Sequence, residues 1–241
     1  MGIAPVHVLP GVGQNLHDHP AIEVRYAGTP DLVAAMQAFG ASGGWLSEEQ
    51  TIAKARSSLC QSAFDLHLYP IGGPTSGNGS SWLFTLPVAQ MTPRSRGSLH
   101  ISSGDPEAPP VIDHGYLTDP HGYDVAVLLD GIEVVRTLAE QLPLARLIGA
   151  ETFPGLHVQG RDELRTYVLA HAEHYYHPVG TCKMGPASDP FAVVDTCGQV
   201  HGIEGLTVAD ASIMPVIPRA NTNIPCVVVG EKIASVLCPT G

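Results

Sequence analysis

Apolar and polar residues alternate in several stretches of the chain, and this pattern predicts short half-buried strands. The expected strands cover residues 21–27, 62–69, 81–91, 97–103 and 206–209. Pro87 cannot donate a backbone hydrogen bond, so it predicts that the strand over 81–91 lies at a sheet edge or carries a bulge. We expect the strands between residues 62 and 103 to pair as an antiparallel sheet.

Apolar residues at a spacing of three or four predict four helices. The expected helices cover residues 31–39, 120–142, 162–172 and 225–237. In the longest, we expect Asp119 to be the N-cap, Pro120 to occupy the first turn and Pro143 to end the helix. Clusters of glycine and proline at 70–80 and 104–110 predict loops. Together the elements predict an α+β fold, an antiparallel sheet flanked by helices.

Composition narrows the classes of function. Apolar residues make up 44% of the 241 residues and charged residues 15%, so the chain can bury a sizeable core. The net charge of −11, from 12 basic and 23 acidic residues, argues against nucleic acid or an anionic membrane as partner. No apolar stretch approaches the roughly 20 residues of a membrane span.

The cysteines and the N-terminal residues indicate the cellular compartment of the protein. The five cysteines include no CxxC pair, so we expect free thiols and not a disulfide framework. Residues 1–11 contain glycine and proline at positions that interrupt a secretory signal. We therefore predict a cytoplasmic protein.

Two polar clusters near the C-terminus carry candidate chemistry. The first is the segment His177–Gly185, where a histidine in a loop has the pKa that suits a general base. A histidine in a chain with 12 of them is also compatible with a structural or exposed role. The second is the segment Asn221–Pro225, at the start of the last predicted helix. There Asn223 is compatible with a plain helix cap, or with a helix N-terminus that stabilises an anion.

A metal site is the rival interpretation of these histidines. His171, His174 and His177 are spaced three apart, and the segment 17–19 is a second group of donors. Pro178 disfavours helical backbone at His177, which breaks the required geometry. No HExxH motif is present. We therefore expect no metal site.

Other catalytic motifs are missing from the sequence. No GxSxG elbow of a serine hydrolase occurs. Gly11 and Gly13 resemble the start of a dinucleotide fingerprint, but Leu16 stands where the third glycine would be. The sequence therefore offers neither a nucleophilic serine nor a phosphate loop.

Several ordered strings of residues are unusual when taken together. They are Pro10–Leu16, Asp18–Pro20, Pro93–Gly97, Asp105–Pro106, Tyr116–Leu117, His177–Gly185, Val194–Asp195, Val200–Gly202, Gly205–Pro215 and Asn221–Leu237. In this order they closely resemble the glucose–methanol–choline (GMC) flavoprotein oxidoreductases, and in particular their choline-dehydrogenase-like bacterial branch. The resemblance extends along nearly the whole chain.

The resemblance implies a reaction. Members of this family oxidise the CH–OH group of a small-molecule alcohol to a carbonyl, and the hydride goes to N5 of FAD. By position, His177 is similar to the residue that accepts the hydroxyl proton. Asn223 is similar to the second member of the pair that orients the substrate oxygen.

The resemblance also implies which residues contact FAD. Asp210 and Ala211 would lie beside its ribityl and pyrophosphate groups. The segment Asn221–Pro225 would lie against the pyrimidine ring, whose charge in the reduced state suits a helix N-terminus. A third group would line the cofactor near the junction of two domains, namely Asn15, Asp18 and His19. The full set of expected cofactor residues is Asn15, Asp18, His19, Asp210, Ala211, Asn221, Thr222, Ile224 and Pro225.

The implied domains are incomplete. Residues 1–20 would form a junction segment, 21–175 the substrate-binding domain, and 176–241 the C-terminal part of a Rossmann-like FAD-binding domain. The βαβ unit with the GxGxxG fingerprint, with which family chains begin, is not in this sequence. We would then expect an unpaired sheet edge and an exposed apolar face.

Three arrangements are compatible with this incomplete pattern. The chain is one half of a split enzyme, whose companion chain supplies the GxGxxG half. Alternatively it is a catalytically incompetent fragment of a longer reading frame. In the third arrangement it is a non-redox binding protein. The sequence alone does not choose among them.

Overall fold

The computed structural model describes residues 4–45, 51–75 and 81–238, which form two compact units. The sheet unit comprises residues 20–91 and 122–173, and the terminal unit comprises residues 4–19, 92–121 and 174–238. The limits of these units at 19/20 and 173/174 lie within two residues of the predicted boundaries, and the assignment of a substrate-binding and an FAD-binding domain remains a prediction. Residues 92–121, however, fold with the terminal unit and not with the middle of the chain.

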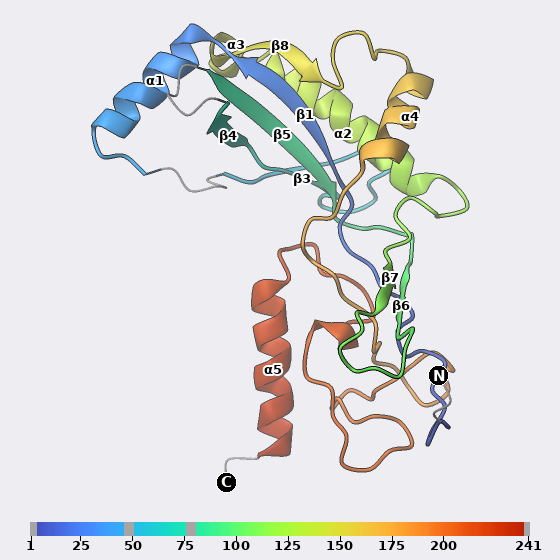
Figure 1. Cartoon of the computed structure of the whole chain (residues 1–241). Coiled ribbons are helices and arrows are strands. Elements are labelled where there is room, and N and C mark those ends of the chain that lie inside the picture. The colour runs from blue at the N-terminus through green and yellow to red at the C-terminus, as the bar shows by residue number, and fades with distance from the viewer. Residues whose placement is uncertain (1–3, 46–50, 76–80, 239–241) are drawn as a thin grey trace. The chain divides into compact units, whose positions relative to one another are not determined.

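A six-stranded antiparallel sheet forms the centre of the sheet unit (Figure 1). The strand order is β2-β3-β5-β1-β8, and β4 also pairs with β5. The strands are β1 (Ala21–Gly28), β2 (Ala53–Ala55), β3 (Leu66–Leu68), β4 (Ile71–Pro74), β5 (Trp82–Gln90) and β8 (Ile148–Phe153). The longest pairing joins β1 to β5, with Ala21 opposite Ala89 and Ala27 opposite Leu83. The predicted antiparallel sheet is confirmed.

Pro87 does not lie on an edge strand, because β5 is an interior strand. On one side β5 pairs continuously with β1. On its other side it pairs with β4 up to Thr85 and with β3 from Val88 onward. The carbonyl of Pro87 accepts the Tyr69 N–H on that side, so the missing N–H of the proline also faces the gap between the two partners. The proline is tolerated because no ladder bond is lost there.

The Gly- and Pro-rich segment at 70–80 was expected to be a loop, but residues 71–74 form β4. Residues 76–80 lie outside the described residues. The strand expected over 62–69 is confined to β3, because Asp65 bonds locally. Its carboxylate accepts the Ser57 N–H at 2.8 Å and the Ser57 hydroxyl at 2.6 Å.

Four helices belong to the described part of this unit, and the longest of them packs on the sheet (Figure 1). They are α1 (Pro30–Ala41), α2 (Tyr123–Ala139), α3 (Leu144–Leu147) and α4 (Arg161–His171). The apolar stripe predicted for the longest helix is buried, at Val125, Leu128, Leu129, Ile132 and Val135. It packs on β5, β1 and β3. The predicted helices over 31–39 and 162–172 are confirmed as α1 and α4.

The predicted limits of α2 were too wide at both ends. The helix starts at Tyr123, because Gly122 before it has left-handed backbone with a φ of 64°. Asp119 is therefore not the N-cap of α2. The backbone N–H of Asp119 donates to the Ser95 hydroxyl. The helix ends at Ala139, before Pro143 is reached.

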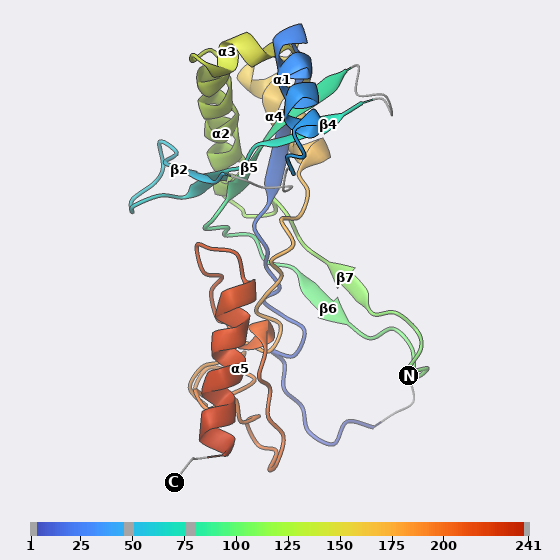
Figure 2. The same cartoon turned by 90° about the vertical axis from the view of Figure 1, so that its left-hand side faces the viewer.

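The terminal unit has little regular structure (Figure 2). Its elements are β6 (Ser98–His100), β7 (Val111–Asp113), the 3₁₀ helix η1 (Ala211–Ile213) and α5 (Asn223–Leu237). The strand expected over 97–103 is β6, but it pairs with β7 in a separate hairpin and does not join the large sheet. A small apolar core holds the unit together, formed by Val193, Val194, Val200, Ile213 and Ile233.

The strand expected over 206–209 is wrong. Leu206 is 48% exposed, and Thr207 makes only an isolated bridge with Gln199. Val208 packs against the apolar core, whereas Leu206 and Ala209 are exposed.

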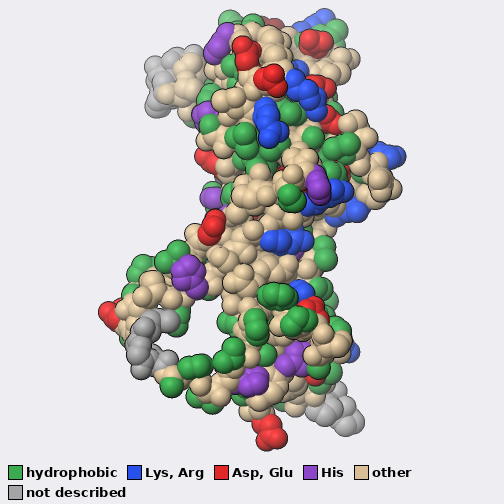
Figure 3. Space-filling model, turned by 90° about the vertical axis from the view of Figure 1, so that its right-hand side faces the viewer, with side chains coloured by type: hydrophobic (Ala, Val, Ile, Leu, Met, Phe, Trp, Pro, Cys, Tyr) green, Lys and Arg blue, Asp and Glu red, His purple; other side chains and the backbone are tan. Residues whose placement is uncertain are grey.

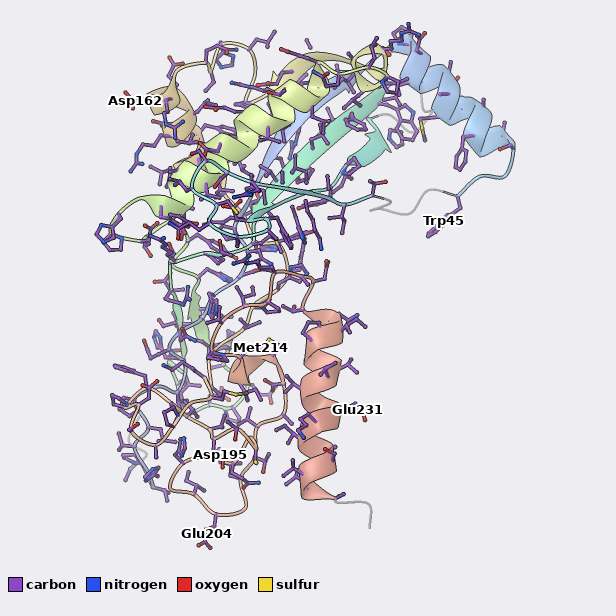
Figure 4. All side chains as sticks on the ribbon, turned by 180° about the vertical axis from the view of Figure 1, so that it is seen from behind. Trp45, Asp162, Asp195, Glu204, Met214 and Glu231 are labelled. Carbon is purple, nitrogen blue, oxygen red and sulfur yellow. The ribbon has the colours of Figure 1, made fainter. Side chains whose placement is uncertain are left out.

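Helix α5 leaves much of its apolar surface exposed. Ile233 is its buried residue, whereas five large apolar side chains are 39–69% exposed. These are Ile224, Val227, Val228, Val236 and Leu237. Glu231 projects from the side of α5 that faces away from Met214 at the end of η1 (Figure 4). This number of exposed apolar side chains on one helix is typical of an element that contacts other polypeptide.

Acidic and basic side chains are interspersed on the face of the molecule shown in Figure 3. Such mixing does not form the continuous basic stripe that a nucleic-acid partner requires. None of the helices in the described part of the chain combines the length and the apolar character needed to cross a bilayer.

Candidate active site

Asp18 joins two distant segments of the terminal unit. The residue is buried, with 2% of its surface exposed. Its Oδ1 accepts the backbone N–H groups of His19 and His177 at 2.7 and 2.9 Å. Its Oδ2 accepts the hydroxyl of Tyr116 at 3.1 Å. Three hydrogen bonds meet the usual requirement for burying a carboxylate.

Tyr116 remains a donor at ordinary pH. Burial is the main cause that raises the pKa of its hydroxyl, and the Asp18 charge raises it further. The phenol therefore stays protonated and keeps its bond to the carboxylate. The ring of Tyr116 also stacks on His114 at a centroid distance of 4.9 Å, which fixes its position.

His177 lies in the loop that precedes η1, as the sequence predicted, and it is 7% exposed. Burial lowers the pKa of His177 below its ordinary value, and the negative charge of Asp18 partly opposes this shift. The imidazole is therefore neutral near pH 7 and able to accept a proton. The ring of Tyr175 packs edge-on against it at 4.6 Å between centroids.

His19 lies next to His177 and has no exposed surface. The two Nδ1 atoms are 3.2 Å apart, and the rings meet at an interplanar angle of 75°. The Nε2 atom of His19 lies 3.1 Å from the carbonyl oxygen of Pro218. Two of the residues expected to line the cofactor, Asp18 and His19, thus contact the predicted base directly.

His17 has a structural role. Its Nδ1 lies 2.6 Å from the carbonyl oxygen of Asn15, and its Nε2 accepts the Ile217 N–H at 2.9 Å. Burial, followed by the positive charge of Arg96, lowers the pKa of His17 to about 4. A neutral imidazole with one proton satisfies both bonds, so this histidine stabilises the loop and does not titrate near pH 7.

We expect His17 to make stability depend on pH. Its pKa is about 4 in the folded state and 6.5 in the unfolded chain, so the unfolded state binds more protons below pH 6.5. Its contribution is therefore present above that pH and is lost as the pH falls toward 4. The loss amounts to about 3 kcal/mol at pH 4. Urea unfolding between pH 7 and 4 should show a shallower decline for His17→Gln than for the wild type, and equal slopes would contradict this assignment.

Asn15 binds the same loop from the other side. Its side-chain amide donates to the carbonyls of Gly180 and Pro215 at 3.2 and 3.4 Å, and its carbonyl accepts from Arg96 Nε at 3.0 Å. Both ends of the Asn15 side-chain amide are therefore hydrogen-bonded within the protein. Its expected role in cofactor binding remains a prediction.

Gly11 and Gly13 pack against protein backbone. A Cβ atom at Gly11 would lie 2.1 Å from the carbonyl oxygen of Phe191, and one at Gly13 would lie 1.9 Å from that of Leu99. Only glycine allows such a close approach. These two glycines therefore allow close packing of backbone against backbone.

The start of α5 differs from the predicted cap. Asn223 is the first helical residue, and the cap position belongs to Thr222, whose side chain makes no capping hydrogen bond. Asn221, Asn223 and Ile224 are exposed, whereas Thr222 is buried. Within the described residues, no hydrogen bond joins Asn223 to His177. The expected pairing of these two residues remains a prediction.

Residues 210 and 211 lie beside the histidine loop. The carboxylate of Asp210 caps η1 by accepting the Ser212 N–H at 2.7 Å. The carbonyl of Ala211 accepts the Gly180 N–H at 3.3 Å. Backbone bonds from residues 182 and 184 to residues 212 and 213 extend this pairing. The expected cofactor segment is therefore fixed to the loop that carries His177.

These groups fit the polar edge of a flavin. The N-terminus of a long helix that has no side-chain cap, with exposed asparagines beside it, suits an electron-rich ring. The residues that would hold such a ring are Asn221, Thr222, Asn223, Ile224 and Pro225. Asp210, an exposed acceptor, is suited to the hydroxyl groups of a ribityl chain.

Asp18, His19 and His177 also resemble a set of metal ligands, because one donor atom of each lies within 4.8 Å of the others. The donor atoms are already engaged, however. Asp18 accepts three hydrogen bonds, and the two histidines bond to each other. A metal would have to break these bonds, so we favour the hydrogen-bonded cluster.

The fold of this chain is similar to that of solved oxidoreductases. Solved oxidoreductases share the fold, including pyridoxine 4-oxidase from Mesorbium loti at 25% identity with a TM-score of 0.81. That alignment covers 98% of this chain and 45% of the oxidase. Formate oxidase shares the fold at 22% identity with a TM-score of 0.80, over 98% of this chain and 48% of the oxidase.

The family follows from the sequence. Residues 93–230 match the family model described as GMC oxidoreductase. The protein therefore belongs to the GMC oxidoreductase family, as the ordered strings of residues indicated. The fold class and the resemblance predicted from the sequence are both confirmed.

Curated relatives act on alcohols, according to their names. Oxygen-dependent choline dehydrogenase 1 of Chromohalobacter salexigens is 38% identical over 96% of this chain and 44% of its own length. Choline oxidase of Arthrobacter globiformis is 34% identical, over 95% of this chain and 41% of its own. Alcohol dehydrogenase (acceptor) of Pseudomonas putida is 33% identical, over 98% and 46%. The chain thus spans less than half the length of these relatives.

Sequence reasoning missed two contributors to the site. Tyr116 holds Asp18 across 98 positions, and Pro218 provides a carbonyl to His19 across 199 positions. No periodicity or spacing indicates such contacts. Tyr116 did lie within one of the strings that carry the family resemblance, which was the available signal.

Proposed function

We propose that this chain carries the substrate base of an FAD-dependent oxidoreductase that converts the CH–OH group of a small alcohol to a carbonyl. The observation that carries the proposal is the buried, neutral His177 in a GMC-family chain. The names of the relatives, which include choline and alcohol dehydrogenases, support the substrate class.

Each residue has a defined part in this proposal. His177 accepts the proton of the substrate hydroxyl, because its imidazole is neutral near pH 7. Asp18 holds the backbone of His177 in place through the bond at 2.9 Å. Asn223 orients the substrate oxygen with its side-chain amide, which is exposed and available. FAD, when bound, supplies the acceptor for the hydride.

The FAD-binding surface in this proposal extends beyond the described residues of this chain. The start of α5, the Asp210–Ala211 pair and the loop from Asn15 to His19 would contact FAD. Further polypeptide, on a companion chain or in continuation of this one, would supply the dinucleotide fold and cover α5. Residues 21–175 would supply the substrate-binding domain. A reducing compartment such as the cytoplasm suits the five free cysteines.

One alternative has an observation in its favour. The exposed apolar side chains of α5 support a fragment that is catalytically incompetent, or a non-redox binding protein, until a partner covers them. Both this alternative and the main proposal have a partner that covers α5. They differ in whether the resulting complex carries out redox chemistry.

A test should separate binding from chemistry. The chain is expressed with its native flanking sequence, and flavin absorption is recorded after gel filtration. Small alcohols are then added without oxygen. Bleaching of the visible flavin bands by an alcohol would support the proposal independently of the electron acceptor. Retained flavin that no alcohol bleaches would contradict it and favour the binding protein.

A further inference from the structure

His19 has no part in the reaction as proposed above, yet it is more deeply buried than Asp18 and His177. Both of its ring nitrogens have a polar neighbour. Nε2 lies 3.1 Å from the Pro218 carbonyl oxygen, and Nδ1 lies 3.2 Å from Nδ1 of His177. A buried imidazole held at both ends has a defined orientation, and its proton therefore has a defined place.

The carbonyl of Pro218 determines where that proton lies. A carbonyl oxygen only accepts, so Nε2 of His19 must carry the hydrogen. A neutral imidazole has one N–H, so Nδ1 of His19 has a lone pair and accepts. The donor in the 3.2 Å contact is therefore Nδ1–H of His177. The remaining nitrogen of His177, Nε2, is left with the lone pair.

We propose that His19 is a positioning residue that fixes the tautomer of His177 and makes Nε2 the basic atom. This inference rests on the proposed function, because it matters only if His177 accepts a proton. In water a histidine side chain samples both tautomers, and only the one with a free lone pair toward the substrate can act. The same logic governs other catalytic histidines, whose second nitrogen bonds to an orienting group.

The neighbouring groups maintain this arrangement. Asp18 holds the backbone N–H of both histidines, at 2.7 and 2.9 Å, and so fixes the distance between the two rings. Tyr175 packs against both rings, at centroid distances of 6.3 and 4.6 Å. A His19 carrying two N–H groups would donate to Nδ1 of His177 and move the proton of His177 to Nε2. The base would then be lost, so the neutral form of His19 is the functional one.

Nitrogen-15 NMR of the purified chain at pH 7.5 tests the proposal without any cofactor. The spectrum distinguishes a protonated ring nitrogen from one with a lone pair. We expect His177 to be protonated at Nδ1 and His19 at Nε2. The opposite tautomer at His177 would overturn the proposal. So would a zinc titration in which both histidines lose these signals to a bound metal at stoichiometric zinc.

His19→Gln is the matched variant, because glutamine reaches the Pro218 carbonyl but offers no acceptor at the position of Nδ1. His177 should then lose its preference for Nδ1–H, and turnover of the assembled enzyme should fall by at least about 10-fold, up to the roughly 10²–10⁴-fold that a base contributes. His121→Gln, at an exposed histidine, should change neither. An unchanged tautomer in a folded His19→Gln would overturn the proposal, and if that variant does not fold, the wild-type spectrum decides. A correct tautomer with no alcohol oxidation would overturn the proposed function alone.

Discussion

Replacing His177 with alanine is expected to slow alcohol oxidation by the assembled enzyme by about 10²–10⁴-fold, while flavin stays bound. The side chain is the proton acceptor in the proposed reaction, and the backbone N–H that bonds to Asp18 is unchanged by the substitution. The measurement is the rate at which a saturating alcohol bleaches the flavin without oxygen. Because this rate reports a single turnover, slow product release does not hide the effect.

His174→Ala is the control for this prediction. His174 lies three residues earlier, is exposed, and contacts the ring of Tyr176. Its replacement should leave the bleaching rate within about twofold of the wild type. Full activity of His177→Ala would remove this residue from the mechanism, whatever the control shows.

Replacing Asp18 with alanine is expected to lower the free energy of unfolding by about 2–6 kcal/mol. The substitution leaves the N–H groups of His19 and His177 buried without an acceptor, and each such group costs about 1–3 kcal/mol. Asp18→Asn keeps one carbonyl oxygen in the same place and should lose less. Urea unfolding monitored by near-UV circular dichroism measures both, since the aromatic rings packed around the histidines report on this region.

Asp105→Ala provides the comparison for Asp18. That carboxylate is exposed and accepts a single backbone bond, from Glu107 at 3.0 Å. Its loss should cost no more than about 1 kcal/mol. If Asp18→Ala unfolds no more easily than Asp105→Ala, the carboxylate does not join the two segments as the geometry indicates.

The sequence predicted the regular elements better than their partners. The periodicity of 81–91 correctly gave a strand, and that of 162–172 correctly gave α4. Pairing was less accessible, because it depends on where the chain turns. The strand expected over 97–103 pairs with residues 111–113 in a separate hairpin. Nothing in the residues between the two strands predicts that this hairpin stays apart from the main sheet. The prediction from Pro87 of an edge strand or a bulge failed for a related reason. An interior proline is tolerated there because the partner of β5 changes from β4 to β3 beside it.

The candidate site was predicted residue by residue, and its geometry was not. His177, Asp18 and His19 were each identified from the strings that carry the family resemblance. Their mutual contacts span 158 and 159 positions, and no local pattern encodes such distances. A cap was one of the two interpretations left open for Asn223, but α5 begins at that residue and the cap position belongs to Thr222, whose backbone is already helical.

The composition of the terminal unit from three separated segments has a consequence for biosynthesis. Asp18 emerges from the ribosome 159 residues before His177, the group it must bind. At about 5–20 residues per second, that interval lasts roughly 10–30 s. Nearly all of the sheet unit is translated within this interval, since the unit is complete at residue 173, just before His177. The bond between Asp18 and His177 therefore forms only after the chain of the sheet unit has been made.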